Sequence, residues 1–494
     1  MRIGFDNQLY LDKQAQMIRE KIAQFDNKLY LEFGGKLFDD YHASRVLPGF
    51  DVNAKIRLLQ QFKDQAEIIF CINAGDIENA KIRADFGITY DRDLLRTIDA
   101  MRKLGLLVTS VVITQYSGQP AAETFARMLT QRGVSTYMHE PIPGYPADVD
   151  RVVSDQGYGA NPYIPTTRQL VVVTAPGPCS GKMATCLSQL YHEHRRHVKA
   201  GYAKFETFPI WNLPLKHPVN LAYEAATADL KDVNMIDPFH LEAYGKTTVN
   251  YNRDIEVFPV VRTILERIMG DASVYQSPTD MGVNMAGFAI FDDEAVRQAA
   301  CQEIIRRSYK AWCDYKQGRT DIDTAQRIDV IMNQLALKKE DRRVVTPALA
   351  KSQEKGVPCM AVELPDGQIV TGKTSDLMNA PASVMLNSIK ALAGIADELH
   401  LISPIVLAPI LKLKKHTLHN RMPVLNLEEV LIALSICAAT SPLAELAMDK
   451  LTMLRGCEAH SSHMLTHSDE QMLQRLGLNL TSQAQYPTDD LYFA

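Results

Sequence analysis

The chain has 494 residues, of which 46% are hydrophobic and 22% charged, and its formal net charge is -5 at pH 7. A chain of this length is too long to fold around a single hydrophobic core, so we expect two or three domains. The negative charge, and the lack of a Lys/Arg block interleaved with aromatic residues, argue against nucleic-acid binding as the main task.

The first residues, "MRIGFDNQLYLDKQAQ", lack the apolar core and small-residue cleavage site of a secretory signal. The longest apolar stretches, such as "VLIALSICAA", are about half as long as a membrane span. The eight cysteines are dispersed without a C-x-x-C pair, which fits reduced thiols rather than a disulfide framework or a zinc ribbon. We therefore expect a soluble, cytoplasmic protein with no membrane partner.

Apolar runs alternate with amphipathic segments in the first part of the chain. The runs "KLYLEF", "EIIFCIN", "LLVTSVVIT", "VSTYMH" and "QLVVVTA" have the length and composition of strands, and helices are expected at 91–104 and 120–132. Strands that alternate with helices form a parallel sheet covered by helices. Ligands of such sheets collect at the turns after the strands. The sequence thus predicts an α/β fold with a binding site at this edge.

The remainder of the chain differs in character. Prolines interrupt the segment from Tyr202 to Pro259, and its aromatic residues are too many for a solvated linker, so we expect a long, ordered, functional loop region. Helical periodicity follows in "DDEAVRQAACQEIIRRSYKAWCDYKQG" and "DIDTAQRIDVIMNQLAL". A hairpin, "MAVELPDGQIVTG", and helices near 382–396, 426–439 and 442–454 come last. We predict an α/β domain at 1–225, a loop-rich and helical domain at 226–343, and an α+β domain at 344–494.

Two segments resemble a phosphate-binding loop, in which a glycine turn joins a buried strand to a helix whose first amides face the anion. "GQIVTGKT", Gly367 to Thr374, matches the full G-x-x-x-x-G-K-[ST] pattern, but it reads as a hairpin turn and a returning strand. "TAPGPCSGKMATC" departs from the pattern, yet it follows a strand and precedes a helix. We therefore predict that the second segment, and not the first, binds a phosphate or carboxylate group.

The predicted anion contacts are Gly177, Ser180, Gly181, Lys182 and Thr185. Met183 stands where a nucleotide-hydrolysing loop has the Ser or Thr that holds Mg²⁺, so Thr185 or Ser180 would have to substitute. The alternative is that these glycines serve only the close packing of strand and helix.

Neither histidine cluster has convincing spacing for a metal. In "YHEHRRH" the H-E-x-x-H pattern of zinc proteases fails, because Arg196 occupies the place of the second histidine. In "GCEAHSSHMLTH" the residues Cys457, His460, His463 and His467 are all legitimate zinc ligands. However, a helix stop at Gly456 and a capping box at Ser468 and Gln471 place this cluster in a connection. We predict no metal site.

Long phrases, among them "LEFGGKLFDDYHASRVLPGF", "TAPGPCSGKMATCLSQLYHEH", "MIDPFHLEAYGKTTVNYNRD" and "ELPDGQIVTGKTSDL", resemble a family of bacterial cytoplasmic proteins catalogued as a domain of unknown function. The resemblance spans Ile3 to about Thr481. It implies a Rossmann-like domain, a helical domain and a C-terminal α+β domain, but no reaction and no catalytic residue. Some members have been labelled ATP-dependent zinc proteases, and the histidine spacing argues against that label. The likeness includes Gly456 to Ser461 but neither His463 nor His467.

The leading hypothesis is a cytoplasmic enzyme that acts on a phosphorylated small molecule or a nucleotide. The turn at 177–185 would bind the anion, and the loop at 237–254 would supply acid–base and polar groups. These groups are Asp237, His240, Lys246, Asn250, Arg253 and Asp254. The alternatives are a non-catalytic ligand-binding or sensor protein and a metal-dependent hydrolase. The cofactor is unknown, and a homo-oligomer stays possible.

Overall fold

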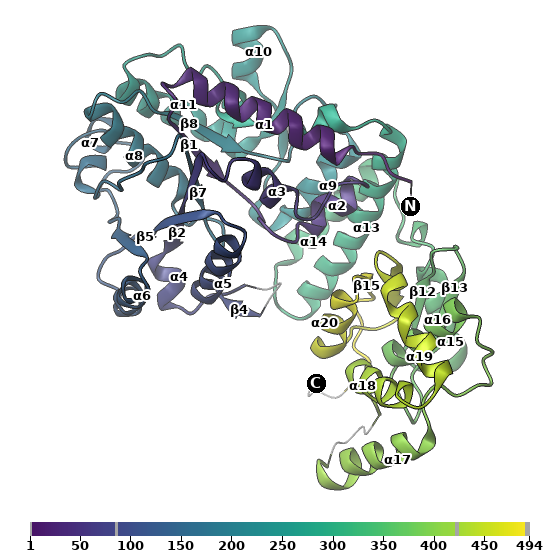
Figure 1. Ribbon diagram of the computed structural model, residues 1–494. Coiled ribbons are helices and arrows are strands. Elements are labelled where there is room, and N and C mark those ends of the chain that lie inside the picture. Colours follow the sequence, from purple (N-terminus) through teal and green to yellow (C-terminus); the bar gives the residue numbers. More distant parts are fainter. Residues whose placement is uncertain (1, 84–86, 420–423, 490–494) are drawn as a thin grey trace. The chain divides into compact units, whose positions relative to one another are not determined.

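The structure is a computed structural model that describes residues 2–83, 87–419 and 424–489 (Figure 1). The chain forms two compact units, the first made of residues 1–224 and 231–300 and the second of residues 225–230 and 301–494. Within the described ranges, no helix combines the length and the apolar character needed to cross a membrane. The three-part division at 225 and 343 stays a prediction, and limited proteolysis would test it by the positions of the first cleavages.

A parallel sheet organises the first unit. In the described chain it has seven strands in the order β11-β8-β1-β7-β2-β5-β6, and each neighbouring pair is parallel. The strands are β1 (Leu29–Phe33), β2 (Ala66–Asn73), β5 (Leu107–Thr114), β6 (Ser135–Met138), β7 (Leu170–Thr174), β8 (Gly201–Phe205) and β11 (Gly282–Val283). Every residue of β1 and β7 is buried, as expected for strands covered on both faces. The predicted α/β class and its five predicted strands are confirmed.

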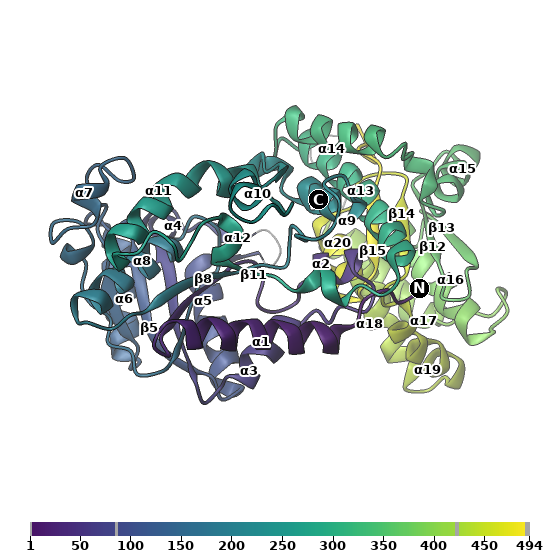
Figure 2. The same ribbon diagram turned by 90° about the horizontal axis from the view of Figure 1, so that it is seen from above.

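Helices cover both faces of this sheet. Figure 2 shows α1 (Asn7–Gln24) and α3 (Ala54–Gln61) on one side, and α8 (Lys182–Arg195) and α11 (Asn252–Met269) on the other. The two helices predicted between strands are α5 (Tyr90–Lys103) and α6 (Pro120–Gln131). The shorter elements are α2 (Tyr41–Val46), α4 (Ala74–Glu78), β3 (Ile82–Arg83), β4 (Ile88–Thr89), α7 (Val149–Val152), η1 (Tyr158–Ala160), α12 (Pro278–Met281) and η3 (Ala286–Ala289).

The connections between strands place a crevice at the carboxyl edge of the sheet. The chain passes from β2 to β5 in one direction along the sheet, and from β7 through α8 to β8 in the opposite direction. Because strand–helix–strand crossovers are right-handed, these two connections lie on opposite faces, and their loops separate between β7 and β2. Ligands of open α/β sheets bind at such points. A binding site is therefore expected beside the turns that follow β1, β2 and β7.

The segment 202–259 is more regular than the predicted single loop region, so that prediction is wrong. It holds most of β8, then α9 (Pro218–Ala226), η2 (Ala228–Leu230), β9 (Asn234–Ile236), α10 (Pro238–Tyr244), β10 (Val249–Tyr251) and the start of α11. Pro218 and Pro238 begin helices, because the first helical position does not use the N–H that proline lacks. Pro259 lies inside α11. Three of the prolines that suggested a loop thus mark helix starts or a helix interior, whereas Pro209 and Pro214 lie in the irregular chain between β8 and α9.

The second unit contains a mixed sheet whose described strands run in the order β13-β12-β14-β15. β12 (Cys359–Glu363) pairs antiparallel with β13 (Ile369–Lys373) and with β14 (Glu458–Ser461), and β14 pairs parallel with β15 (Asn479–Ser482). The remaining helices are α13 (Asp293–Lys316), α14 (Ile322–Gln334), η4 (Lys339–Asp341), α15 (Val345–Lys355), α16 (Ala380–Ala393), α17 (Pro404–Lys412), η5 (Leu413–Thr417), α18 (Leu427–Ala438), α19 (Pro442–Asp449), η6 (Lys450–Leu454) and α20 (His467–Arg475). The predicted hairpin and the predicted helices of this part are confirmed.

Candidate functional site

The turn after β7 joins a buried strand directly to a helix. It comprises residues 175–181, and α8 begins at Lys182 with Gly181 as its N-cap. Gly181 has a φ of 80°, a left-handed conformation that glycine adopts without steric penalty. No side-chain cap bond closes this end of α8 in the described chain, so its first amides and the positive end of its dipole remain available to an anion. The predicted order of strand, glycine turn and helix is confirmed.

Hydrogen bonds and close packing fix the path of this turn. The Ser180 hydroxyl donates to the Gly177 carbonyl at 2.9 Å, and the Thr114 hydroxyl donates to the Ser180 carbonyl at 2.9 Å. A Cβ at Gly177 would lie 2.7 Å from the Tyr90 ring. A Cβ at Gly181 would lie 2.8 Å from Thr114. Close packing alone therefore requires glycine at both positions, so the alternative that these glycines serve only packing stays open.

The predicted anion contacts differ in exposure. Gly177, Gly181 and Lys182 are partly exposed, whereas Ser180 is buried at 2% and Thr185 at 0% exposure. The Thr185 hydroxyl accepts a hydrogen bond from the Cys71 thiol of β2 at 3.4 Å, so it faces the core. Both hydroxyls considered as Mg²⁺ ligands are thus engaged inside the protein. The structure places three of the five residues in the turn, Lys182 directly after it and Thr185 beneath it.

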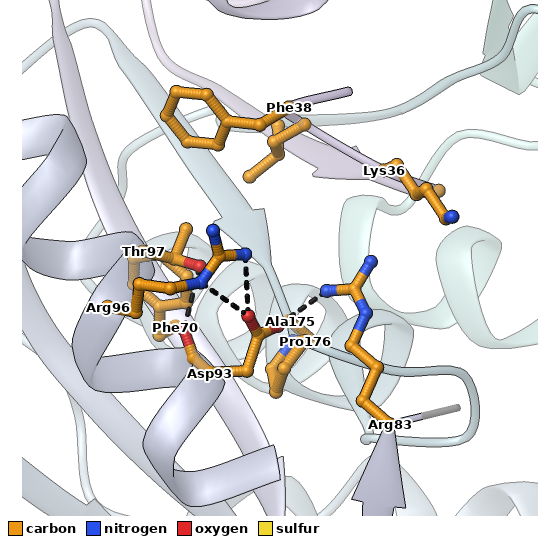
Figure 3. A pocket seen from close by; sticks show the side chains of 11 residues that line it. Lys36, Phe38, Phe70, Arg83, Asp93, Arg96, Thr97, Ala175 and Pro176 are labelled. Atoms are coloured by element: carbon orange, nitrogen blue, oxygen red, sulfur yellow. Dashed lines mark hydrogen bonds and ion pairs between the residues drawn. The ribbon is translucent and has the colours of Figure 1, made fainter. Parts of the chain in front are cut away.

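A pocket lies beside the turn at the expected edge of the sheet (Figure 3). Its volume is about 350 Å³, with the open space at its mouth included. The lining comes from the turn after β1, from β2, β3 and α5, and from the residues directly after β7. These residues are Gly35, Lys36, Leu37, Phe38, Phe70, Arg83, Asp93, Arg96, Thr97, Ala175 and Pro176. We name it the cationic pocket, since three cationic side chains and one carboxylate line it.

Asp93 orients the two arginines of the cationic pocket. Its carboxylate is fully buried and accepts hydrogen bonds from Arg83 Nη1 at 2.5 Å and from Arg96 Nε at 3.1 Å and Nη2 at 2.8 Å. Figure 3 shows both guanidinium groups reaching this carboxylate, with Lys36 across the pocket. The Arg96 side chain is 45% exposed, so part of it faces solvent. Planar cations held in fixed orientation suit phosphate or carboxylate ligands.

A second pocket, of about 300 Å³ with the open space at its mouth included, includes the first turn of α8. Its lining residues are Met183, Lys204, Glu206, Asn250, Asp254, Val257, Val261, Pro278 and Met281. The Lys204 ammonium lies 2.8 Å from Glu206 Oε1 and 2.6 Å from Asp254 Oδ2. We name it the lysine–carboxylate pocket. It places a cluster of charged groups next to the turn predicted to bind the anion.

The predicted catalytic residue Asp237 belongs to a buried network. It is fully buried and caps α10 by accepting hydrogen bonds from the amides of Phe239 and His240, both at 3.0 Å. Its second oxygen accepts a hydrogen bond from the Thr279 hydroxyl at 2.8 Å. Asn250 lies 3.5 Å from the same oxygen and also lines the lysine–carboxylate pocket. Asp237 is therefore part of the framework behind that pocket.

The other four predicted catalytic residues occupy different environments. His240 Nδ1 lies 3.0 Å from the Ser277 hydroxyl, and Lys246 is exposed. Arg253 is half-exposed and pairs with Asp232 at 3.2 Å. Asp254 lines the lysine–carboxylate pocket. Of the predicted set, Asn250 and Asp254 thus line a pocket beside the turn, and the roles of all six residues stay predictions.

Lys204, Glu206, Arg83 and Arg96 are not among the residues predicted from the sequence. A signal for the first two was present in "YAKFETF", because a buried parallel strand is expected to be continuously apolar and Lys204 interrupts it. The arginines carried no comparable signal. They lie on β3 and α5, far from β7 in sequence, and only the fold brings them to the cationic pocket.

The second histidine cluster lies partly on a strand. His460 is on β14, fully buried, with Nδ1 2.8 Å from the Thr481 hydroxyl. His467 is the first residue of α20, so the prediction of a connection is wrong for both residues. Thr466, rather than Ser468, caps the helix that follows. Across the described residues, no three His, Cys, Asp or Glu side chains are grouped so that they could hold a metal ion.

The fold and its pockets define an α/β protein with a parallel sheet, in which one pocket lies beside the glycine turn after β7 and a second includes the first turn of α8. The chain belongs to the family described as "Domain of unknown function DUF1846": the model of its N-terminal part matches residues 3–336, and that of its C-terminal part matches residues 340–492. It is 57% identical over 501 residues to the "UPF0371 protein" of Clostridium tetani and 58% identical to that of a Clostridium botulinum type F strain. Each alignment covers both chains in full. The family resemblance is confirmed.

Proposed function

We propose that this protein is an enzyme that acts on a phosphorylated small molecule or a nucleotide, whose phosphate binds at the start of α8. The observation that carries this proposal is the uncapped N-terminus of α8, with Lys182 at its first position, directly after the central strand β7. Unpaired amides and the helix dipole attract an anion at such a terminus. The Lys182 ammonium adds a charge-assisted donor.

The surrounding charges support an anionic ligand. Lys36, Arg83 and Arg96 line the cationic pocket with one carboxylate, although the whole chain has a formal net charge of -5. Cationic side chains that line a cleft raise the local concentration of anions. The pocket also lies where the loops after β7 and β2 separate, which is the usual ligand position in sheets of this kind.

The predicted residues divide into different roles under this proposal. Gly177 and Gly181 let the backbone approach the phosphate, Ser180 holds the turn, and Thr185 packs beneath it. Among the predicted acid–base residues, Asp254 faces the ligand because it lines a pocket beside the turn. The proposal assigns Asp237 and His240 to the support of that pocket, and Lys246 and Arg253 to polar contacts at the surface.

A ligand screen followed by an activity assay tests the proposal. Purified protein is heated with inorganic phosphate, with nucleotides and with phosphorylated sugars, and a ligand at 100 times its dissociation constant adds roughly 2.7 kcal/mol to stability. We expect at least one phosphorylated compound to stabilise the protein and to be converted by it. Stabilisation without conversion would favour the non-catalytic binding protein, and no stabilisation by any of them would contradict an anion site at α8.

A further inference from the structure

The lysine–carboxylate pocket contains a charged cluster that phosphate binding at α8 does not explain. The Lys204 side chain is 24% exposed, and it contacts the carboxylates of Glu206, 8% exposed, and Asp254, 16% exposed. Apolar side chains complete the walls, namely Met183, Val257, Val261, Pro278 and Met281. Apolar walls with a few converging polar groups are typical of small-molecule sites.

The charges within this pocket largely offset one another. Burial raises the pKa of Glu206 and outweighs the opposing effect of Lys204, so this carboxyl keeps its proton to a higher pH than an ordinary glutamate. Burial alone lowers the pKa of Lys204, but the carboxylates of Asp254 and Glu206 raise it overall, so the ammonium stays charged. The Lys204 cation therefore offsets the Asp254 anion, and Glu206 adds a carboxyl with a reduced tendency to ionise.

The groups around this cluster are already partnered or neutral. The Tyr202 hydroxyl donates to Glu32 Oε2 at 2.8 Å, so this carboxylate has a buried partner. Burial raises the pKa of Tyr202 and of Tyr251 well above the ordinary value, which keeps both phenols neutral. The Tyr251 ring stacks on the Tyr223 ring with 5.5 Å between centroids. Apart from the Lys204 cluster, the polar groups here are therefore hydrogen-bonded to one another or uncharged.

Hydroxyl groups suit this combination of donors and acceptors. A carboxylate accepts hydrogen bonds from hydroxyls, whereas an ammonium donates to them. A ligand ammonium would compete with Lys204 for the same carboxylates, and a ligand anion would meet the Asp254 carboxylate. Sites built to hydrogen-bond a hydroxyl discriminate strongly against compounds that lack it.

Met183 lines this pocket and directly follows Lys182 at the start of α8. A ligand whose phosphate lies on the α8 amides therefore reaches the pocket with its adjoining atoms. We propose that the lysine–carboxylate pocket binds the hydroxyl groups of a sugar phosphate whose phosphate lies at the α8 N-terminus. This inference rests on the proposed function for the position of the phosphate, and it adds the class of ligand.

Calorimetric titration of the full chain tests the inference. The probes are inorganic phosphate, glycerol phosphate, ribose phosphate and glucose phosphate. Hydrogen bonds to charged groups predict that at least one of the three phosphate esters binds about tenfold or more tightly than inorganic phosphate. If inorganic phosphate binds and none of the esters binds more tightly, the inference is wrong and the proposed function stands. If no probe binds, both fail.

A pocket-filling variant identifies where the additional affinity arises. Val257 lines the pocket and is 40% exposed, so Val257→Trp fills it from the rim and leaves the ion pairs intact. We expect this variant to bind the tightest ester no better than inorganic phosphate, with the affinity for inorganic phosphate unchanged. Glu256→Trp, at the neighbouring exposed position of α11, is the matched control and should bind like the parent. An unchanged preference for the ester in Val257→Trp would overturn the inference.

Discussion

The turn after β7 and the hairpin between β12 and β13 both contain a Gly-Lys pair, at 181–182 and at 372–373, but they fold differently. In the turn, Gly181 ends a connection from a buried parallel strand, and α8 begins at the next residue. In the hairpin, Gly367 bends the chain with a φ of 84°, and residues 369–373 return as β13, paired with β12. The next helix, α16, does not begin until Ala380. The order of strand, turn and helix, rather than the sequence motif, decides whether helix amides are available to phosphate.

Lysine replacement is expected to show the largest difference between the two segments. Lys182→Ala removes a charge-assisted donor, which contributes on the order of 1.5–3 kcal/mol, so affinity for a phosphate ligand should fall roughly 10- to 150-fold. Lys373→Ala, on the hairpin strand, should leave that affinity nearly unchanged. Calorimetric titration with inorganic phosphate, or with the best ligand from the screen, measures both variants.

Thermal unfolding of the two lysine variants provides the control, because both side chains lie at partly or fully exposed positions and neither change should disturb folding. A tenfold loss of affinity in Lys373→Ala would show that the hairpin, rather than the turn, binds the phosphate. Unchanged phosphate affinity in Lys182→Ala would indicate that the glycines of the β7–α8 turn serve only the packing of strand and helix.

Glycine replacement separates packing from binding. Gly181→Ala introduces a Cβ 2.8 Å from Thr114 at a residue with a φ of 80°, and Gly372→Ala introduces one against the backbone of Val384 in α16. Overpacking and left-handed strain each cost on the order of 1–3 kcal/mol, so both variants should unfold more easily. We expect only Gly181→Ala to weaken phosphate binding as well. Denaturant unfolding measures stability, and calorimetric titration measures phosphate affinity. An equal loss of phosphate affinity in both variants would contradict a binding role that is specific to the turn.

The hairpin sheet should respond to acid through His460, which lies beside β12 on β14. Burial, assisted by the Arg342 guanidinium, lowers the pKa of His460 to about 3. His460 therefore takes up a proton near pH 6.5 in the unfolded chain but only near pH 3 in the folded state. Its contribution to the free energy of unfolding is complete above pH 6.5 and is lost as the pH falls toward 3. The expected slope is about 1.4 kcal/mol per pH unit.

The chain's two tryptophans make this acid effect measurable in one unit. Trp211 lies in the first unit and Trp312 in the second, so urea unfolding of a Trp211→Phe background follows the second unit by fluorescence. His460→Asn should reduce the acid slope by about one proton. His400→Asn, at an exposed position of the same unit, should retain the parent slope. The same slope in both variants would rule out His460 as the source.

The smallest effect is expected at Met183, the residue that replaces the usual Mg²⁺ hydroxyl. Its side chain is partly exposed, so Met183→Ala should lower the unfolding free energy by about 1 kcal/mol or less. Affinity for inorganic phosphate, measured with and without Mg²⁺, should not change. A new dependence on Mg²⁺, or a large loss of phosphate affinity, would contradict a turn that holds its anion through amides and Lys182.

Local pattern was sufficient for much of the fold. Continuous apolar runs located β1, β2, β5, β6 and β7, and the change from strand to helical periodicity located α5 and α8. Proline misled the prediction over 202–259, because its role at the start of a helix looks the same in sequence as its role in a loop. His460 was misplaced because a four-residue strand such as β14 leaves too short a pattern to recognise.

The candidate site was predictable where its residues adjoin in sequence, as in the turn from Gly177 to Lys182. It was not predictable where distant segments meet. Asp93 and the arginines that it holds come from α5 and β3, and they reach the turn after β7 only through the crossing connections of the sheet. The pairing of Lys204 with Glu206 could have been predicted from the sequence, since a charged side chain in a buried parallel strand requires a partner.

The tip of the β7–α8 turn offers a chemical handle. Cys179 lies there with a φ of 54°, and it is the one exposed thiol among the eight cysteines, all of which fall within the described residues. A thiol-specific fluorescent dye should therefore react at this position before any other. Placed one residue from Ser180 and three from Lys182, such a dye should report the binding of the proposed anion at the turn as a change in emission, with no need for an activity assay.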